Sequence, residues 1–237
     1  APTQPCHLSW VRPQRRRHDM PCRPAGTPAH PASRPLLPPG LTRVLYLDCD
    51  TLALTSLRPL LERWFDCIDR YNAVRGDNDT PYWYDEKANL GLLSAAAWMA
   101  EMVTLQDTQT RKQLEDGERN ARADLFIASS ETRAYLQATQ RWPRVNSLNL
   151  TQALAEITSD AKRISYSSDL KLGCLFVAPQ KAQHGATPEE LQDMVDDLQK
   201  EHSCAVAWYF PYAYRKLRNE AGNYHPGIAV LFKEAHG

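Results

Sequence analysis

Residues 43–60 read RVLYLDCDTLALTSLRPL, and the apolar run at their start ends in two carboxylates one residue apart. An apolar run without alternation predicts a buried strand, as in a parallel sheet. Asp48 and Asp50 fall at the carboxyl end of this strand, which is the edge where open α/β sheets bind ligands. The sequence therefore predicts an α/β fold with a mostly parallel central sheet flanked by helices.

Asp48 and Asp50 form a D-x-D motif, and this spacing suits a hard divalent cation. Where a chain turns at the end of a strand, both side chains can reach one ion. Mn²⁺ and Mg²⁺ take oxygen ligands and also bridge phosphate oxygens. The alternative is that one aspartate caps the next helix and the other faces solvent, and so short a motif does not decide between them.

The stretch YLDCDTLALTSLRPLL, residues 46–61, resembles the D-x-D segment of GT-A-fold nucleotide-sugar glycosyltransferases. The likeness is strongest to glycosyltransferase family eight and the related nucleotide-diphospho-sugar transferases. It implies metal-dependent transfer of a sugar from a nucleoside-diphosphate donor, such as a UDP-sugar, to a glycan, protein or small-molecule acceptor. By this resemblance Asp50 would hold Mn²⁺ (or Mg²⁺) on the donor diphosphate, and Asp48 would contact the ribose or the metal.

The end of the chain, NYHPGIAVLFKEAHG, resembles the late loop that closes over the donor in family eight. By this resemblance His225 completes the metal shell, the Gly227 amide meets the diphosphate, and Lys233 neutralises charge on the leaving group. The residue types and their order match, but the spacing departs from the family pattern. The resemblance predicts that His225 lies close to Asp50 although far from it in sequence.

The loop DNDTPYWYDEK, residues 77–87, supplies candidates for a sugar pocket, with a surface turn as the alternative. Asp77 would accept hydrogen bonds from sugar hydroxyls, and the face of Trp83 would stack on a sugar ring. The next segment, residues 89–105, resembles a family strand that leads into a helix. By that resemblance Asn89 and Gly91 would lie beside the sugar.

Periodicity predicts further elements. Apolar spacing predicts a helix after Thr55, and Thr187 with Glu190 forms a capping box before a second helix. We expect a short strand at residues 71–76, and an exposed helix or loop at residues 109–121. Residues 122–142 resemble a strand, a polar turn and a helix that ends in Trp, and this segment competes with 89–105 for one place in the family pattern.

The composition excludes some functions and divides the chain. The 237 residues contain 28 basic and 28 acidic side chains, so no net charge favours nucleic acid or an anionic membrane surface. Residues 1–40 are rich in Pro and Arg and predict a disordered arm. Residues 41–237 would then form a GT-A-like domain that lacks its amino-terminal part. The sequence contains no membrane-spanning segment, and its six cysteines lack metal-type spacing.

Two other functions stay open. Haloacid-dehalogenase-type phosphohydrolases also place D-x-D after a strand, but the acidic pair Asp196–Asp197 lies on a predicted helix rather than at a strand end. A catalytically inactive, transferase-like domain is the third hypothesis. The resemblance places the chain in a Golgi or secretory lumen if an anchor precedes it, and otherwise in the cytoplasm.

Overall fold

The computed structural model describes residues 44–47, 52–76, 78–145, 147, 149–165, 169–181, 186–200, 204–211 and 217–236. Three predicted site residues, Asp48, Asp50 and Asp77, lie outside these described residues, and so does the predicted arm at residues 1–40.

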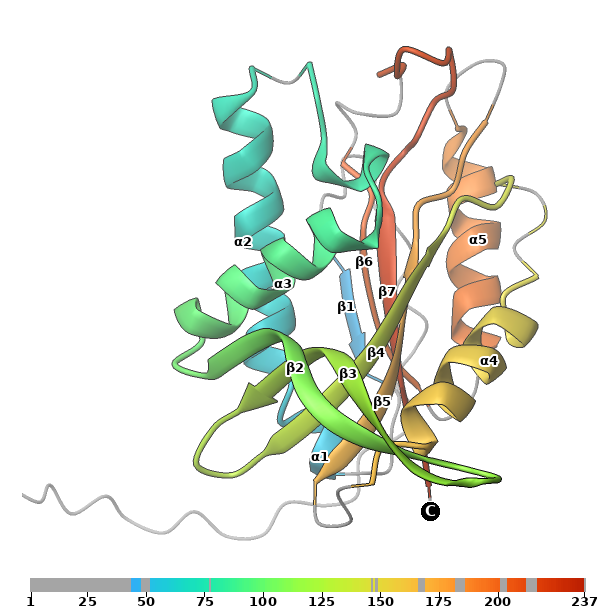
Figure 1. The fold of residues 1–237 in the computed structure, drawn as a ribbon. Coiled ribbons are helices and arrows are strands. Elements are labelled where there is room, and N and C mark those ends of the chain that lie inside the picture. Colours follow the sequence, from blue (N-terminus) through green and yellow to red (C-terminus); the bar gives the residue numbers. More distant parts are fainter. Residues whose placement is uncertain are drawn as a thin grey trace, which may run out of the picture. The chain divides into compact units, whose positions relative to one another are not determined.

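Seven strands form one sheet in the order β1-β6-β7-β5-β4-β3-β2 (Figure 1). Only β4 and β5 run parallel, and every other neighbouring pair is antiparallel. The prediction of a mostly parallel, GT-A-like sheet is therefore wrong. The strands are β1 (Val44–Leu47), β2 (Val103–Leu114), β3 (Gly117–Ala128), β4 (Arg133–Arg141), β5 (Leu170–Val177), β6 (Cys204–Tyr209) and β7 (Ile228–Glu234).

Helices cover both faces of the sheet, and this burial explains why the strand direction was predicted wrongly. In Figure 1 α2 (Arg58–Val74) and α3 (Glu86–Met99) lie on one side, and α4 (Thr151–Lys162) and α5 (Pro188–Lys200) lie on the other. Every residue of β6 is buried, as are most of β5 and β7. Burial on both faces removes the alternation of apolar and polar residues whatever the strand direction, so an apolar run does not prove a parallel sheet.

The strand before the D-x-D motif is β1, and it lies at one end of the sheet rather than at its centre. Its one partner among the described strands is β6, with Val44 opposite Trp208 and Leu47 opposite Ala205. A ligand at the end of β1 would thus lie at the margin of the sheet, and not at the central crevice that the resemblance implies.

The helix predicted after Thr55 is confirmed as α2, which follows the short α1 (Leu52–Thr55). Its buried stripe includes Leu60, Leu61 and Trp64. The strand predicted at residues 71–76 is wrong, because Ile68 and Asn72 continue the buried stripe and α2 runs on to Val74.

Residues 86–99 form α3 and not a strand, because the Asp85 carboxylate accepts hydrogen bonds from the amides of Lys87 and Ala88 and caps the helix. The helix or loop predicted at residues 109–121 is also wrong. These residues belong to the β2–β3 hairpin, which turns at Glu115 and Asp116, directly before Gly117 with its φ of 118°. The helix predicted within residues 122–142 is the strand β4.

The capping box before α5 is confirmed. The Glu190 carboxylate accepts a hydrogen bond from the Thr187 amide at 2.9 Å, and the Thr187 hydroxyl accepts one from the Glu190 amide at 3.3 Å. The stripe of Leu191, Met194 and Leu198 is buried in a core cluster together with residues of β6 and β7.

Close packing of α4 on β5 at Gly173 gives a test of the fold. A Cβ at this position would lie 2.8 Å from the backbone of Thr158, so we expect Gly173→Ala to lower the free energy of unfolding by about 1–3 kcal/mol. Gly91 lies within α3 and has no heavy atom within 4 Å of such a Cβ, so Gly91→Ala should raise it by about 0.5–1 kcal/mol. Urea unfolding measures both, and equal effects would contradict the packing.

Candidate functional site

Polar side chains gather on the face of β2, β3 and β4 that is turned away from α3. On the face toward α3, Leu125, Ile127 and Leu136 are buried in the main core. Residues directly opposite each other in a ladder share a face. Leu105, Phe126 and Tyr135 therefore form a row on the other face, and alternation adds Asp107, Asp124 and Gln137 beside it. We call these six residues the open face.

The strands part at Asp124, in the middle of the open face. The β3–β4 ladder runs from Ala128–Arg133 to Leu125–Leu136 and goes no further. Beyond it, the Asp124 carboxylate accepts a hydrogen bond from the Ala138 amide at 2.7 Å, and the Gln137 side chain donates to the Arg122 carbonyl at 3.0 Å. Hydrogen bonds that involve side chains thus take the place of main-chain hydrogen bonds between β3 and β4, and the hairpin leaves the plane of β4.

The released hairpin brings Lys112 to α4. Its ammonium group donates to the Gln137 amide oxygen at 3.1 Å and to the Asp160 carboxylate at 2.7 Å. Beside Lys112, the Gln113 amide donates to the Arg163 carbonyl at 2.7 Å, which ties the hairpin to the end of α4. Three strands and one helix thus contribute to one polar cluster, which we call the Asp124 cluster: Lys112, Asp124, Gln137 and Asp160.

The Asp124 carboxyl is half-buried, and burial raises its pKa. The Ala138 amide and the Lys112 ammonium oppose this rise, while the charges of Asp160 and Asp107 add to it. A carboxylate held in this way is poorly stabilised as an anion. A cation bound beside it would relieve that strain, and perturbed carboxyls of this kind occur often at functional sites.

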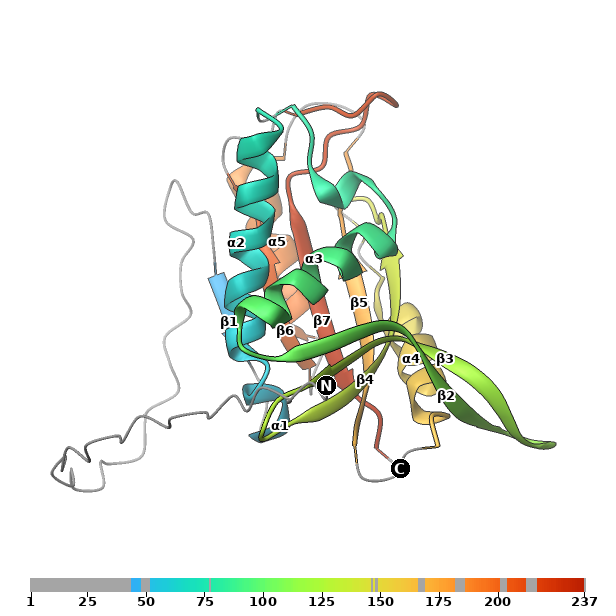
Figure 2. The same ribbon diagram turned by 60° about the vertical axis from the view of Figure 1, so that its left-hand side comes forward.

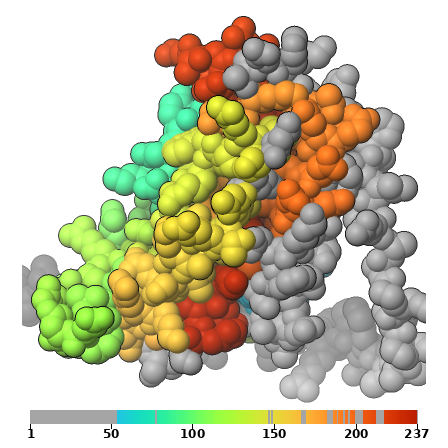
Figure 3. All heavy atoms as spheres, turned by 90° about the vertical axis from the view of Figure 1, so that its right-hand side faces the viewer, coloured from blue at the N-terminus to red at the C-terminus, as the bar shows by residue number. Residues whose placement is uncertain are grey.

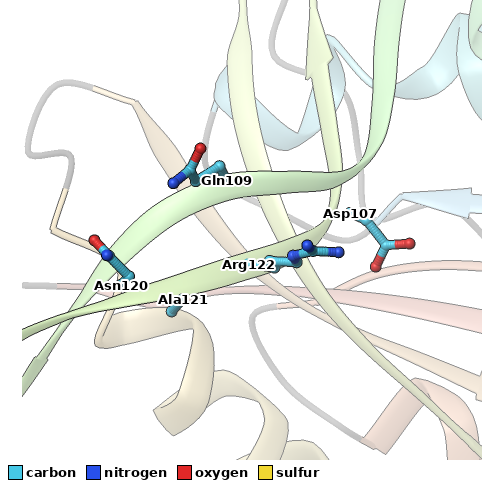
Figure 4. A pocket seen from close by; sticks show the side chains of 5 residues that line it. All are labelled: Asp107, Gln109, Asn120, Ala121 and Arg122. Carbon is cyan, nitrogen blue, oxygen red and sulfur yellow. The ribbon is translucent and has the colours of Figure 1, made fainter.

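A hollow of about 570 Å³ lies along the hairpin and is lined by Asp107, Gln109, Asn120, Ala121 and Arg122. Figure 4 shows the Arg122 side chain extending along the hairpin in the direction of the Asp107 carboxylate. Asp107 has a φ of 49°, a conformation that is uncommon for a residue other than glycine. The hollow therefore joins a guanidinium and amide groups to the neighbourhood of Asp124.

Of the three residues predicted for a late metal loop, Lys233 lies far from Gly227. Gly227 precedes β7, whereas Lys233 is on β7 opposite Gly173 and Cys204. Lys233 lies six residue steps beyond Gly227 along the extended chain, a span of about 20 Å. Gly227 has a packing role, because a Cβ there would collide with the Tyr209 carbonyl oxygen.

His225 lies at the other end of the sheet from the carboxyl end of β1. Leu47 is opposite Ala205, and Ala205 is opposite Phe232, so the end of β1 is level with the end of β7. His225 precedes the start of β7 instead. Asp50 itself lies outside the described residues, so a shared metal ion stays a prediction that these registers do not favour.

Three residues that were predicted to line a sugar pocket, Asn89, Gly91 and Trp83, lie within the described part of the structure. The Asn89 side chain donates to the Gln140 amide oxygen at 2.7 Å and is buried. Gln140 in turn donates to the Tyr82 and Tyr84 carbonyls, which holds the short helix η1 (Pro81–Trp83) against β4. Gly91 lies inside α3, and Trp83 packs partly against the core.

The loop before η1 is fixed by Asp79, whose carboxylate accepts hydrogen bonds from Tyr71 at 2.7 Å, Tyr84 at 3.0 Å and Arg75 at 3.1 Å. Burial alone would raise the pKa of Asp79, but these three donors outweigh it and lower the pKa. Their combined effect is to lock the end of α2 to the loop.

No protein-family model matches the sequence, and no curated protein or solved structure matches it either. Within the described part of the chain, no group of three or more His, Cys, Asp or Glu side chains is placed to hold a metal ion. No described helix is long and apolar enough to cross a membrane.

Sequence reasoning missed the Asp124 cluster. Its members are far apart in the chain, and only the strand register brings them together. One signal was available. In RADLFIAS, residues 122–129, Asp124 directly precedes a continuous apolar run, where a carboxylate needs a partner or a function.

His225 gives a test by pH. Burial lowers its pKa, against the opposing effect of hydrogen bonds to the Ala178 and Pro179 carbonyls. The unfolded chain therefore binds a proton more readily than the folded one, so stability should fall as the pH drops below about 6.5. We expect His225→Asn to flatten this slope in urea unfolding. The exposed His236 is the control, and an equal flattening in His236→Asn would contradict the assignment.

Proposed function

We propose that the chain is a divalent-cation-dependent enzyme that hydrolyses a phosphate ester, with its centre at Asp124. The observation that carries this proposal is the half-buried Asp124 carboxylate, which accepts a hydrogen bond from the Ala138 amide where β3 leaves β4. The charges of Lys112 and Asp160 lie near enough to shift its pKa in opposite directions. Carboxylate and amide oxygens are the ligands that Mg²⁺ and Mn²⁺ take.

The cluster supplies the charges that such a reaction needs. A cation at Asp124 would bind a phosphate oxygen and lower the pKa of a bound water. In such a hydrolysis the water oxygen would bond to phosphorus, the ester P–O bond would break, and the water proton would go to the departing alkoxide. The charge of Lys112 acts on Asp124 and would stabilise charge on the phosphoryl oxygens, with Asp160 fixing the position of the ammonium group.

The rest of the open face favours a substrate with a ring next to the phosphate. The Phe126 and Tyr135 rings lie 4.9 Å apart between their centroids and are partly exposed. Aromatic faces of this kind stack on nucleobases. Arg122, on the hollow beside Asp124, suits a second phosphate oxygen. A nucleotide is the substrate class that uses all of these groups.

Nucleotide-sugar transfer stays a prediction that depends on Asp48 and Asp50, outside the described residues. The phosphohydrolase of the haloacid-dehalogenase type depends on the same two residues. Neither reaction could use Asp124 together with a residue at the end of β1, because five strand spacings, about 24 Å, separate β1 from β3 in the sheet.

Calorimetric titration with Mn²⁺, followed by UDP, tests the proposal. We expect Mn²⁺ to bind the unaltered chain and Asp124→Asn to weaken this binding by at least about tenfold, because the variant removes the anionic ligand. UDP binding should then require Mn²⁺. Asp116→Asn, on the exposed turn of the same hairpin, is the matched control and should bind as the unaltered chain does.

The same variant should leave the fold intact. Because burial raises the pKa of Asp124 in the folded chain, stability declines as the pH rises through that pKa, and the anion is destabilising at pH 7. We expect Asp124→Asn to unfold at an equal or higher urea concentration at pH 7. A stabilised variant that still binds Mn²⁺ would sink the proposal, as would loss of binding in Asp48→Asn alone.

A further inference from the structure

Among the described residues, no strand pairs with the outer edge of β2, which is the edge away from β3. β2 is the last strand in the order of the described strands. Beyond Thr110 its outer edge is covered, because the Gln113 amide donates to the Arg163 carbonyl and the Ser165 amide donates to the Arg111 carbonyl. By two-residue alternation, Val103, Leu105 and Gln109 turn backbone groups toward the uncovered part.

Apolar side chains surround this open edge. Leu105 is 63% exposed and Val103 is 49% exposed. The end of α3, directly before β2, exposes Trp98 by 59% and Met99 by 45%. Natural sheets protect exposed edges with lysine, proline or bulges. Residues 103–106 read VTLQ, with no charge and no proline.

Acidic side chains stand at both ends of the uncharged stretch. Glu101 precedes it and Asp107 follows it, and both have positive φ, at 61° and 49°. Neither forms an ion pair with another described residue within 4 Å. If a second copy paired with this edge about Thr104, Glu101 of each copy would face Asp107 of the other. Like charges disfavour that pairing.

We infer that the edge of β2 between Glu101 and Asp107 binds an extended segment of a different protein, with apolar side chains in the middle and Lys or Arg at both ends. The segment adds a strand to the sheet. Its main chain bonds to the outward groups of Val103 and to the Leu105 amide, since the Leu105 carbonyl accepts a hydrogen bond from the Thr108 hydroxyl. Its apolar side chains cover Leu105 and Trp98, and its cations meet Glu101 and Asp107. This inference does not depend on the proposed enzymatic function.

Amide hydrogen exchange by NMR tests the inference with two synthetic peptides, Lys-Val-Thr-Ile-Thr-Val-Lys and its Glu-ended counterpart. We expect the Lys-ended peptide to slow exchange at the outward amides of β2 and the Glu-ended peptide to bind at least about tenfold more weakly. Leu105→Lys should abolish the protection. Val74→Lys changes an apolar residue that is 80% exposed elsewhere and should keep it.

Three results would overturn the inference. They are no protection by either peptide, equal binding of both, and protection that survives in Leu105→Lys. Protection that instead grows with protein concentration in the absence of peptide, together with a dimer in sedimentation, would identify a second copy as the occupant and reject the basic segment.

Discussion

The hydrogen bond from the Ala138 amide to the Asp124 carboxylate determines the architecture of the candidate site. It stands where a main-chain ladder bond would otherwise join β3 to β4, so the two strands separate at that residue. The hairpin then reaches the end of α4, and Lys112 arrives between Gln137 and Asp160. Figure 2 shows the hairpin extending away from the body of the sheet, and Figure 3 shows its turn projecting beside α4. Asp124 therefore separates the two strands and also supplies the carboxylate of the candidate site.

Local signals in the sequence predicted α2 and α5 correctly, but the helix expected within residues 122–142 is the strand β4. The buried stripe of α2 contains Leu60, Leu61 and Trp64, and the capping box of α5 is formed by Thr187 and Glu190. Each of these features depends on residues that are close in sequence. Strand direction was not predictable in this way. It depends on which strands neighbour each other, and the apolar runs of β5, β6 and β7 read alike in a parallel or an antiparallel sheet.

The site was less predictable than the fold. A D-x-D motif concentrates attention because its two carboxylates are adjacent in the chain, whereas Asp124 and Gln137 meet only through the register of β3 and β4. Likewise His225 and Lys233 are close in sequence, yet an extended strand holds them apart. Asn89, which the resemblance assigned to a donor sugar, instead bonds to Gln140 and supports η1. Sequence proximity was a poor guide to spatial proximity in each case.

The location of a bound metal ion is the central claim, and paramagnetic broadening by Mn²⁺ measures it directly. We predict that substoichiometric Mn²⁺ broadens the amide signals of residues 123–125 and 137–139 first and leaves those of Val44–Leu47 sharp, since about 24 Å separates β1 from β3. Broadening that begins at Val44–Leu47, with residues 123–125 unaffected, would contradict the account and return the metal to Asp48 and Asp50.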